Sequence, residues 1–156
     1  MLVTQRQRQL DSIRSGFYTI DWNGALGSLN ALDLCSLVRG STVLDAESIL
    51  ANIDFRNGDW TESKTLKYLD RFLHELEMSS HGGLRLFLQF VTGRPTLPLG
   101  GLQKKISLVR VPGSDRLPEA HTCFDTLDLP EYENYHILRS KFLTAMMNDD
   151  GRFDLF

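Results

Sequence analysis

The sequence contains little cysteine and no excess of positive charge. Only Cys35 and Cys123 occur among its 156 residues, and no CxxC pair is present. A disulfide framework and a cysteine-based metal site are therefore excluded, which favours a reducing cytoplasmic or nuclear setting. Seventeen Lys and Arg residues stand against twenty Asp and Glu residues, a formal net charge of −3. A broad nucleic-acid surface needs a positive excess, so we expect no nucleic-acid partner.

Long hydrophobic runs and several well-known motifs are also missing. No stretch approaches the roughly 18 consecutive apolar residues of a membrane-spanning helix, and residues 1–10 lack the apolar core of a signal peptide, so we expect no membrane association. The Gly- and Pro-rich segment 93–101 has neither a GKS or GKT ending nor GxGxxG spacing, and no GxSxG occurs. No histidine has a partner at metal-ligand spacing, so we expect no metal.

What the chain does contain is typical of a folded domain. Hydrophobic residues make up 42% and charged residues 24% of the sequence. This balance predicts one domain, or one lobe with a piece of its neighbour. Apolar spacing and capping residues predict helices, the first of them ended by Gly16, and alternation predicts two strands. The helices are expected at 5–14, 30–38, 45–53, 63–76, 84–91 and 134–147, and the strands at 105–111 and 120–127. The fold class is therefore α/β or α+β, with helices packed on a short sheet.

Two further features concern the first half of the chain. Asn57 and Gly58 interrupt two helical patterns and predict a hinge. Cys35 lies within a leucine-rich helix, so we expect it to pack in a core rather than to react.

Residues 117–125 (LPEAHTCFD) carry the most chemistry. In a strand, side chains two apart share a face, so His121, Cys123 and Asp125 would project together. A thiol beside an imidazole can be a nucleophile, because the thiolate is the reactive form. The alternative is that Cys123 is a small buried apolar residue and that His121 is a surface hydrogen-bonding group. His121 would favour the thiolate and Asp125 would oppose it, so their net effect stays open.

Three segments together resemble a known family. Residues 117–132 (LPEAHTCFDTLDLPEY) resemble the active-site strand of HECT-type E3 ubiquitin ligases, and residues 87–93 (FLQFVTG) resemble a second segment of that family. Residues 151–156 (GRFDLF) resemble its C-terminal tail, with Phe153 at the fourth position from the end. Residues 95–102 (PTLPLGGL) are most similar to the ubiquitin-fusion-degradation and thyroid-receptor-interacting branch, whereas His121 is more typical of other HECT enzymes.

The resemblance implies a domain organisation. Residues 1–56 would be the C-terminal end of the large, mainly helical N-lobe, residues 57–59 the interlobe hinge, and residues 60–156 the catalytic C-lobe. The front of the N-lobe, which docks the E2 ubiquitin-conjugating enzyme in the family, is absent. We therefore expect a fragment or an unusually short product, weakly active by itself.

The resemblance also implies a mechanism without a metal or organic cofactor. Cys123 would accept ubiquitin from an E2 as a thioester and pass it to a substrate lysine, with His121 and Asp125 as candidate assisting groups. Leu117, Pro118 and Thr122 would lie along the ubiquitin tail, and Phe153 would anchor the C-terminal tail against the N-lobe. The alternative function is a non-catalytic ubiquitin-binding or regulatory lobe that lacks E2 access.

Overall fold

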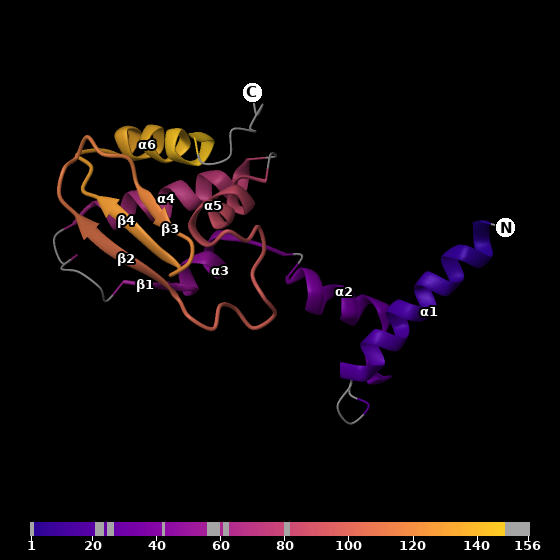
Figure 1. Ribbon diagram of the computed structural model, residues 1–156. Helices are drawn as coiled ribbons and strands as arrows, with labels where there is room; N and C mark the ends of the chain where they lie inside the picture. Colours follow the sequence, from indigo (N-terminus) through magenta and orange to yellow (C-terminus); the bar gives the residue numbers. More distant parts are fainter. Residues whose placement is uncertain are drawn as a thin grey trace. The chain divides into compact units, whose positions relative to one another are not determined.

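The chain forms two compact units, Met1–Arg39 and Gly40–Phe156. The computed structural model describes residues 2–20, 24, 27–41, 43–55, 60, 63–79 and 82–148. The first unit contains the helices α1 (Leu2–Ile20) and α2 (Ala31–Arg39), shown in indigo and purple in Figure 1.

The prediction that Gly16 ends the first helix is wrong, because α1 continues to Ile20. An isolated glycine weakens a helix by about 1 kcal/mol relative to alanine, which does not by itself break one.

Asn30 caps the start of α2. The Asn30 side-chain oxygen accepts hydrogen bonds from the backbone N–H groups of Leu32 and Asp33 at 2.8 and 3.0 Å, and the Asp33 carboxylate accepts one from the Asn30 N–H. The expectation that Cys35 packs in a core is wrong, because α2 has no buried residue and the Cys35 thiol is exposed. Two helices do not supply the second layer that an apolar stripe needs for burial.

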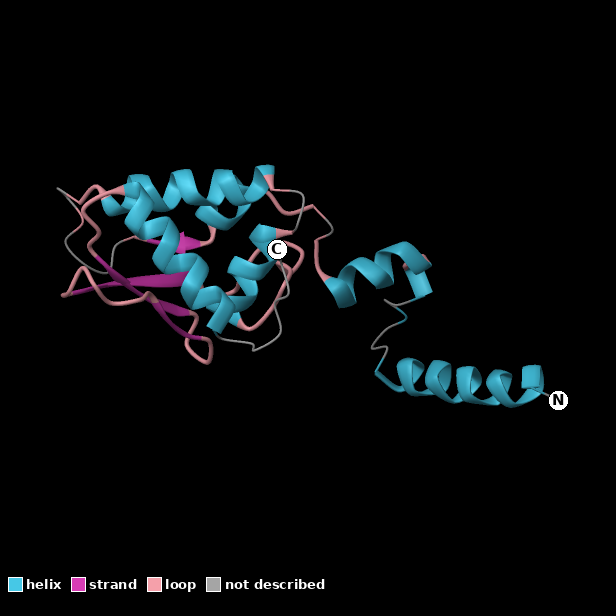
Figure 2. Cartoon of the chain, turned by 90° about the horizontal axis from the view of Figure 1, so that it is seen from above, coloured by secondary structure: helices cyan, strands magenta, loops and turns pink. Residues whose placement is uncertain are grey.

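The second unit is a mixed sheet covered by helices, as the predicted α/β class requires. The sheet has four strands in the order β1-β2-β4-β3. Strands β1, β2 and β4 run parallel, and β3 pairs antiparallel with β4. The helices α4, α5 and α6 lie on one side of the sheet in Figures 1 and 2. The elements are α3 (Ala46–Ala51), β1 (Ile53–Asp54), α4 (Thr65–Met78), α5 (Gly83–Thr92), β2 (Ile106–Val111), β3 (Glu119–His121), β4 (Thr126–Pro130) and α6 (Tyr135–Asn148).

The core lies between the sheet and these helices. The inward-facing residues of the two central strands are fully buried, namely Ile106, Leu108, Leu127 and Leu129. From the helical layer, Phe72 of α4 and Phe142 of α6 stack with ring centroids 5.2 Å apart. Fully burying such a side chain stabilises a fold by about 1.5–3 kcal/mol, so these contacts fix the sheet against its helical cover. No helix in the described ranges has both the length and the apolar character needed to cross a membrane.

Residues 43–55 belong structurally to the second unit. Strand β1 pairs with β2, placing Ile53 opposite Ile106, and Ile49 of α3 is fully buried in the common core. The hinge predicted at 57–59, including Gly58, lies outside the described residues. The assignment of 1–56 and 60–156 to two lobes therefore stays a prediction.

Candidate active site

Cys123 lies in a turn between two strands. Strands β3 and β4 form an antiparallel pair in which His121 faces Thr126, and residues 122–125 connect them. The Phe124 N–H donates to the His121 carbonyl at 2.9 Å, which closes the turn. The predicted continuous strand over 120–127 is therefore wrong. The chain folds back here, and Asp125 takes the positive φ of 48° that aspartate tolerates better than most residues.

This geometry changes how the three predicted catalytic side chains relate. The two-residue alternation of a strand does not extend beyond His121, so the shared face predicted for His121, Cys123 and Asp125 does not form. Within the described part of the chain, no hydrogen bond joins His121 or Asp125 to the Cys123 sulfur. The Cys123 thiol is exposed, and the adjoining Phe124 is 66% exposed. The alternative of a buried Cys123 is wrong, and its reactivity stays a prediction, since a reactive thiol must be accessible but an accessible thiol need not react.

His121 has a carboxylate partner that the sequence did not single out. Its Nε2 lies 3.3 Å from Oδ2 of Asp128, across the pair of strands. Glu119 lies directly opposite Asp128 in the register, so His121 and Asp128 are diagonal neighbours. The signal was present in the sequence, since Asp128 and Thr126 occupy alternate positions of β4. Finding it required the position of the turn, which sets the register.

Asp125 is held at the end of the turn by its backbone and its side chain. Its carbonyl accepts a hydrogen bond from the Ser107 N–H of β2 at 2.9 Å. Its side chain is only 15% exposed, and Nη2 of Arg94 lies 3.9 Å from its Oδ1. No sequence pattern singled out Arg94, which directly follows the 87–93 segment. The structure brings the end of α5 and the Cys123 turn together.

A second cation supports the middle of the turn. Lys104 Nζ donates to the Phe124 carbonyl at 2.9 Å, and the Thr126 hydroxyl donates to the same carbonyl at 3.2 Å. On the other side, a Cβ atom added at Gly93 would lie 3.7 Å from the Thr122 Cβ, so the end of α5 passes close to the turn. The turn that carries Cys123 is therefore contacted from β2, from the loop before β2 and from the end of α5.

A groove of 520 Å³ lies beside β3. Pro118 is buried and Leu117 is 37% exposed, and both line this groove together with Phe90, Ala120 and Ala145. Leu117 and Pro118 therefore lie together at this groove, and their ubiquitin-binding role stays a prediction. Thr122 is exposed on the turn and is not among the residues that line the groove.

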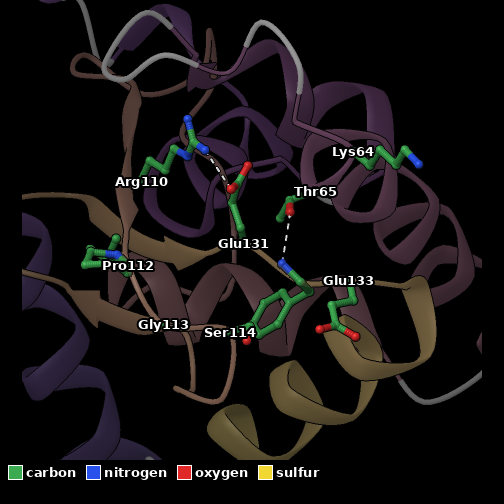
Figure 3. A pocket seen from close by; sticks show the side chains of 10 residues that line it. Lys64, Thr65, Arg110, Pro112, Gly113, Ser114, Glu131 and Glu133 are labelled. Carbon is green, nitrogen blue, oxygen red and sulfur yellow. Dashed lines mark hydrogen bonds and ion pairs between the residues drawn. The ribbon is translucent and has the colours of Figure 1, made fainter.

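A second pocket, of 730 Å³, lies at the opposite ends of the parallel strands. Figure 3 shows Arg110 and Glu131 facing each other there, with Arg110 Nη2 2.6 Å from Glu131 Oε2. The Thr65 hydroxyl oxygen accepts the Tyr132 N–H at 3.2 Å in the same pocket. Because β2 and β4 run parallel, their carboxyl ends lie here and the amino end of β4 adjoins Cys123. This pocket is therefore separate from the Cys123 turn.

Comparison with known proteins decides the family. The family model described as "HECT-domain (ubiquitin-transferase)" matches residues 1–156, the full length of the sequence. The chain belongs to the HECT family. The membership expected from its three segments is thus confirmed. The branch within the family and the individual roles of Cys123, His121 and Asp125 stay predictions.

Several curated relatives are similar to nearly all of this HECT chain. It is 37% identical over 152 residues to a Dictyostelium discoideum protein named bifunctional serine/threonine-protein kinase/NEDD4-like E3 ubiquitin-protein ligase, a match covering 97% of this chain and 8% of that protein. It is 34% identical over 157 residues to the E3 ubiquitin-protein ligase UPL4 of Arabidopsis thaliana, a match covering 96% of this chain and 10% of UPL4. It is 31% identical over 163 residues to the E3 ubiquitin-protein ligase TOM1 of Saccharomyces cerevisiae, a match covering 99% of this chain and 5% of TOM1. The chain spans a tenth or less of these relatives.

Proposed function

We propose that this chain is the catalytic end of a HECT-type E3 ubiquitin ligase and that Cys123 carries ubiquitin. The observation that supports the proposal most directly is an exposed thiol on a turn that follows β3. The groove lined by Leu117 and Pro118 lies beside that strand. The family and the relatives' names supply the reaction class.

The place of β3 suits the delivery of a C-terminal peptide. Among the described strands β3 lies at one edge of the sheet, where an extended segment can add by backbone hydrogen bonding. A segment running parallel to β3 would end where β3 ends, at the Cys123 turn, whereas an antiparallel segment would begin there. Only the parallel arrangement presents a C-terminal carbonyl to Cys123, which is how a ubiquitin tail would arrive.

The proposed reaction has two acyl transfers. The Cys123 thiolate attacks the carbonyl carbon of the thioester between the E2 and ubiquitin, so that a new S–C bond forms and the E2 thiolate leaves. A substrate lysine amine then attacks the Cys123 thioester, forming a C–N bond, releasing the Cys123 thiolate and losing a proton. Exchange between thioesters is nearly isoenergetic, so placement and proton handling dominate catalysis. Asp125 is a candidate acceptor for that proton.

The proposed partners are ubiquitin, an E2 and protein substrates, and the proposed location is the reducing cytoplasm or nucleus, where the exposed Cys123 remains a thiol. The surface that docks the E2 in the family is expected upstream of this chain. We therefore expect weak thioester formation by residues 1–156 and stronger formation by a chain extended upstream to a complete HECT domain.

A non-reducing gel tests this function. The extended chain is incubated with E1, E2, ATP and ubiquitin, and we expect an adduct that disappears on treatment with thiol. Cys123→Ala should abolish the adduct, while Cys35→Ala, which removes the other exposed thiol, should leave it in place. An adduct that survives Cys123→Ala would end the assignment. Ubiquitin binding with no adduct in any chain would support the non-catalytic alternative.

A further inference from the structure

The carboxylate of Asp125, in the turn that carries Cys123, is largely buried. Its Oδ1 is shielded from solvent and receives no hydrogen bond in the described part of the chain. An ionised oxygen in such a place is unfavourable unless an opposite charge compensates for the lost hydration. The residue also has a positive φ of 48°, a conformation that needs support from its surroundings.

Arg94 is the cation placed to compensate for this charge. Its Nη2 lies 3.9 Å from Asp125 Oδ1, a distance for charge attraction rather than a hydrogen bond. Lys104, the other cation at the turn, donates instead to the Phe124 carbonyl. Removing Arg94 would leave a largely buried carboxylate uncompensated. Removing Lys104 would cost less, because the Phe124 carbonyl would still accept a hydrogen bond from the Thr126 hydroxyl.

The backbone of Arg94 is itself fixed. Helix α5 ends at Gly93, which has a φ of 71°, and the buried Thr92 hydroxyl donates to the Leu88 carbonyl at 2.8 Å. The same Thr92 oxygen accepts the Arg94 N–H at 3.3 Å. The Arg94 side chain therefore starts from a hydrogen-bonded helix end that passes close to Thr122.

We propose that Arg94 is a positioning residue for the Cys123 turn: its ion pair with Asp125 holds residues 122–125 in the conformation that presents the thiol. The contribution of Arg94 to catalysis rests on the proposed ligase function. Its effect on the turn does not, so the two can be tested separately. The pair also links two of the segments that resemble the family, since the residue after 87–93 lies beside a carboxylate of 117–132.

Amide hydrogen exchange in chains of residues 1–156 tests the positioning role. The Phe124 N–H, bonded to the His121 carbonyl, reports on the turn. We expect Arg94→Gln to speed its exchange at least tenfold, while Arg94→Lys retains most of the protection. Asp125→Asn removes the charge that needs compensation, and asparagine tolerates positive φ. The double variant Arg94→Gln/Asp125→Asn should therefore return to within threefold of the parent.

The outcomes separate the proposal from simple packing by the arginine stem. If the double variant exchanges as fast as Arg94→Gln alone, or if Arg94→Gln exchanges like the parent, the proposal is wrong. Lys104→Gln is the matched control and should change Phe124 exchange less than threefold. Should Arg94→Gln fail to fold, Arg94→Lys and the double variant still decide the question, because both are expected to fold and protect the turn.

A second measurement addresses catalysis. In a complete HECT domain under single-turnover conditions, Arg94→Gln should lower the maximal rate of thioester formation about tenfold without changing the E2–ubiquitin concentration that gives half the maximal rate. Arg94→Lys, which keeps the positive charge beside Asp125, should retain most of that rate. A parent domain that forms no thioester would refute the proposed function and leave the exchange result standing.

Discussion

Two separate features require glycine at position 40, its backbone conformation and the lack of space for a side chain. Its φ is +80°, in the left-handed region that is common just after a helix end, and a Cβ atom there would lie 2.3 Å from the Leu97 carbonyl oxygen. That oxygen is already engaged, since it accepts the Ser41 N–H at 2.8 Å. The backbone around 40–41 therefore has little freedom to move aside.

We predict that Gly40→Ala destabilises the fold more than Gly100→Ala does. Both glycines have positive φ, which disfavours alanine by about 1–2 kcal/mol, but a Cβ atom at Gly100 meets nothing within 4 Å. The contact with Leu97 should add about 1–3 kcal/mol for Gly40→Ala alone. Urea unfolding of the two variants measures the difference, and equal losses of stability would show that the backbone at Leu97 yields without cost.

At the scale of elements, a polar contact joins α4 to α6. The Tyr135 hydroxyl and the Arg139 guanidinium of α6 both donate to the Glu75 carboxylate of α4. Burial raises the pKa of Tyr135 to about 12, with the hydrogen bond to Glu75 adding to the effect, so the phenol stays protonated and can donate at neutral pH. Arg71 stacks 4.0 Å above the centre of the same ring.

The charge on Glu75 makes this contact dependent on pH. Burial alone would raise the pKa of Glu75, but hydrogen bonds from Tyr135 and Arg139 together with the charges of Arg139 and Arg71 outweigh it, so the pKa lies below its ordinary value of 4.5. Because folding lowers this pKa, ionised Glu75 contributes its full stabilisation at pH values above 4.5. That stabilisation is lost as the pH falls through the pKa that Glu75 has in the folded protein.

We predict that Glu75→Gln lowers the free energy of unfolding by about 1 kcal/mol at pH 7, a modest amount because the pair with Arg139 is partly exposed. The difference between parent and variant should shrink as the pH falls from 4.5 towards 3. Urea unfolding at several pH values measures it. A difference that grows in acid would mean that the pKa of Glu75 is raised rather than lowered by folding.

At the scale of the whole molecule, the buried core contains no residue before Ala46 among those described. We predict that a chain of residues 40–156 folds without the first unit, with a melting temperature within about 4 °C of the longer chain, the shift expected for 1 kcal/mol or less. Circular dichroism during heating measures this, and loss of the cooperative transition would show that residues 1–39 are needed for stability.

In a complete HECT domain, Phe153 is expected to join the C-terminal tail to the N-lobe. Phe153 lies outside the described residues, so its role rests on the resemblance alone. Burial of one phenylalanine against the N-lobe is worth about 1.5–3 kcal/mol, so in a complete HECT domain Phe153→Ala should slow lysine transfer about tenfold or more while sparing thioester formation on Cys123. Single-turnover assays time the two steps separately, and equal slowing of both would place the tail elsewhere in the reaction.

The sequence by itself determined the family and most of the elements. Three short segments of adjacent residues identified the HECT family, and local apolar spacing and caps located α4, α5, α6 and β2 closely. It also located α2 closely, since the helix expected at 30–38 corresponds to Ala31–Arg39. These features depend on residues within a few positions of one another, which periodicity and capping can detect.

Only the tertiary structure decided the surroundings of Cys123. The four-residue turn replaced a predicted strand because pairing with β4, set by the position of β2 in the sheet, requires the chain to reverse at that point. The partnership of His121 with Asp128 depends on that register, and the approach of Arg94 to Asp125 joins positions 31 residues apart through the end of α5. Contacts of this kind arise from how elements pack, so a local pattern in the sequence cannot fix them until the turn and the register are known.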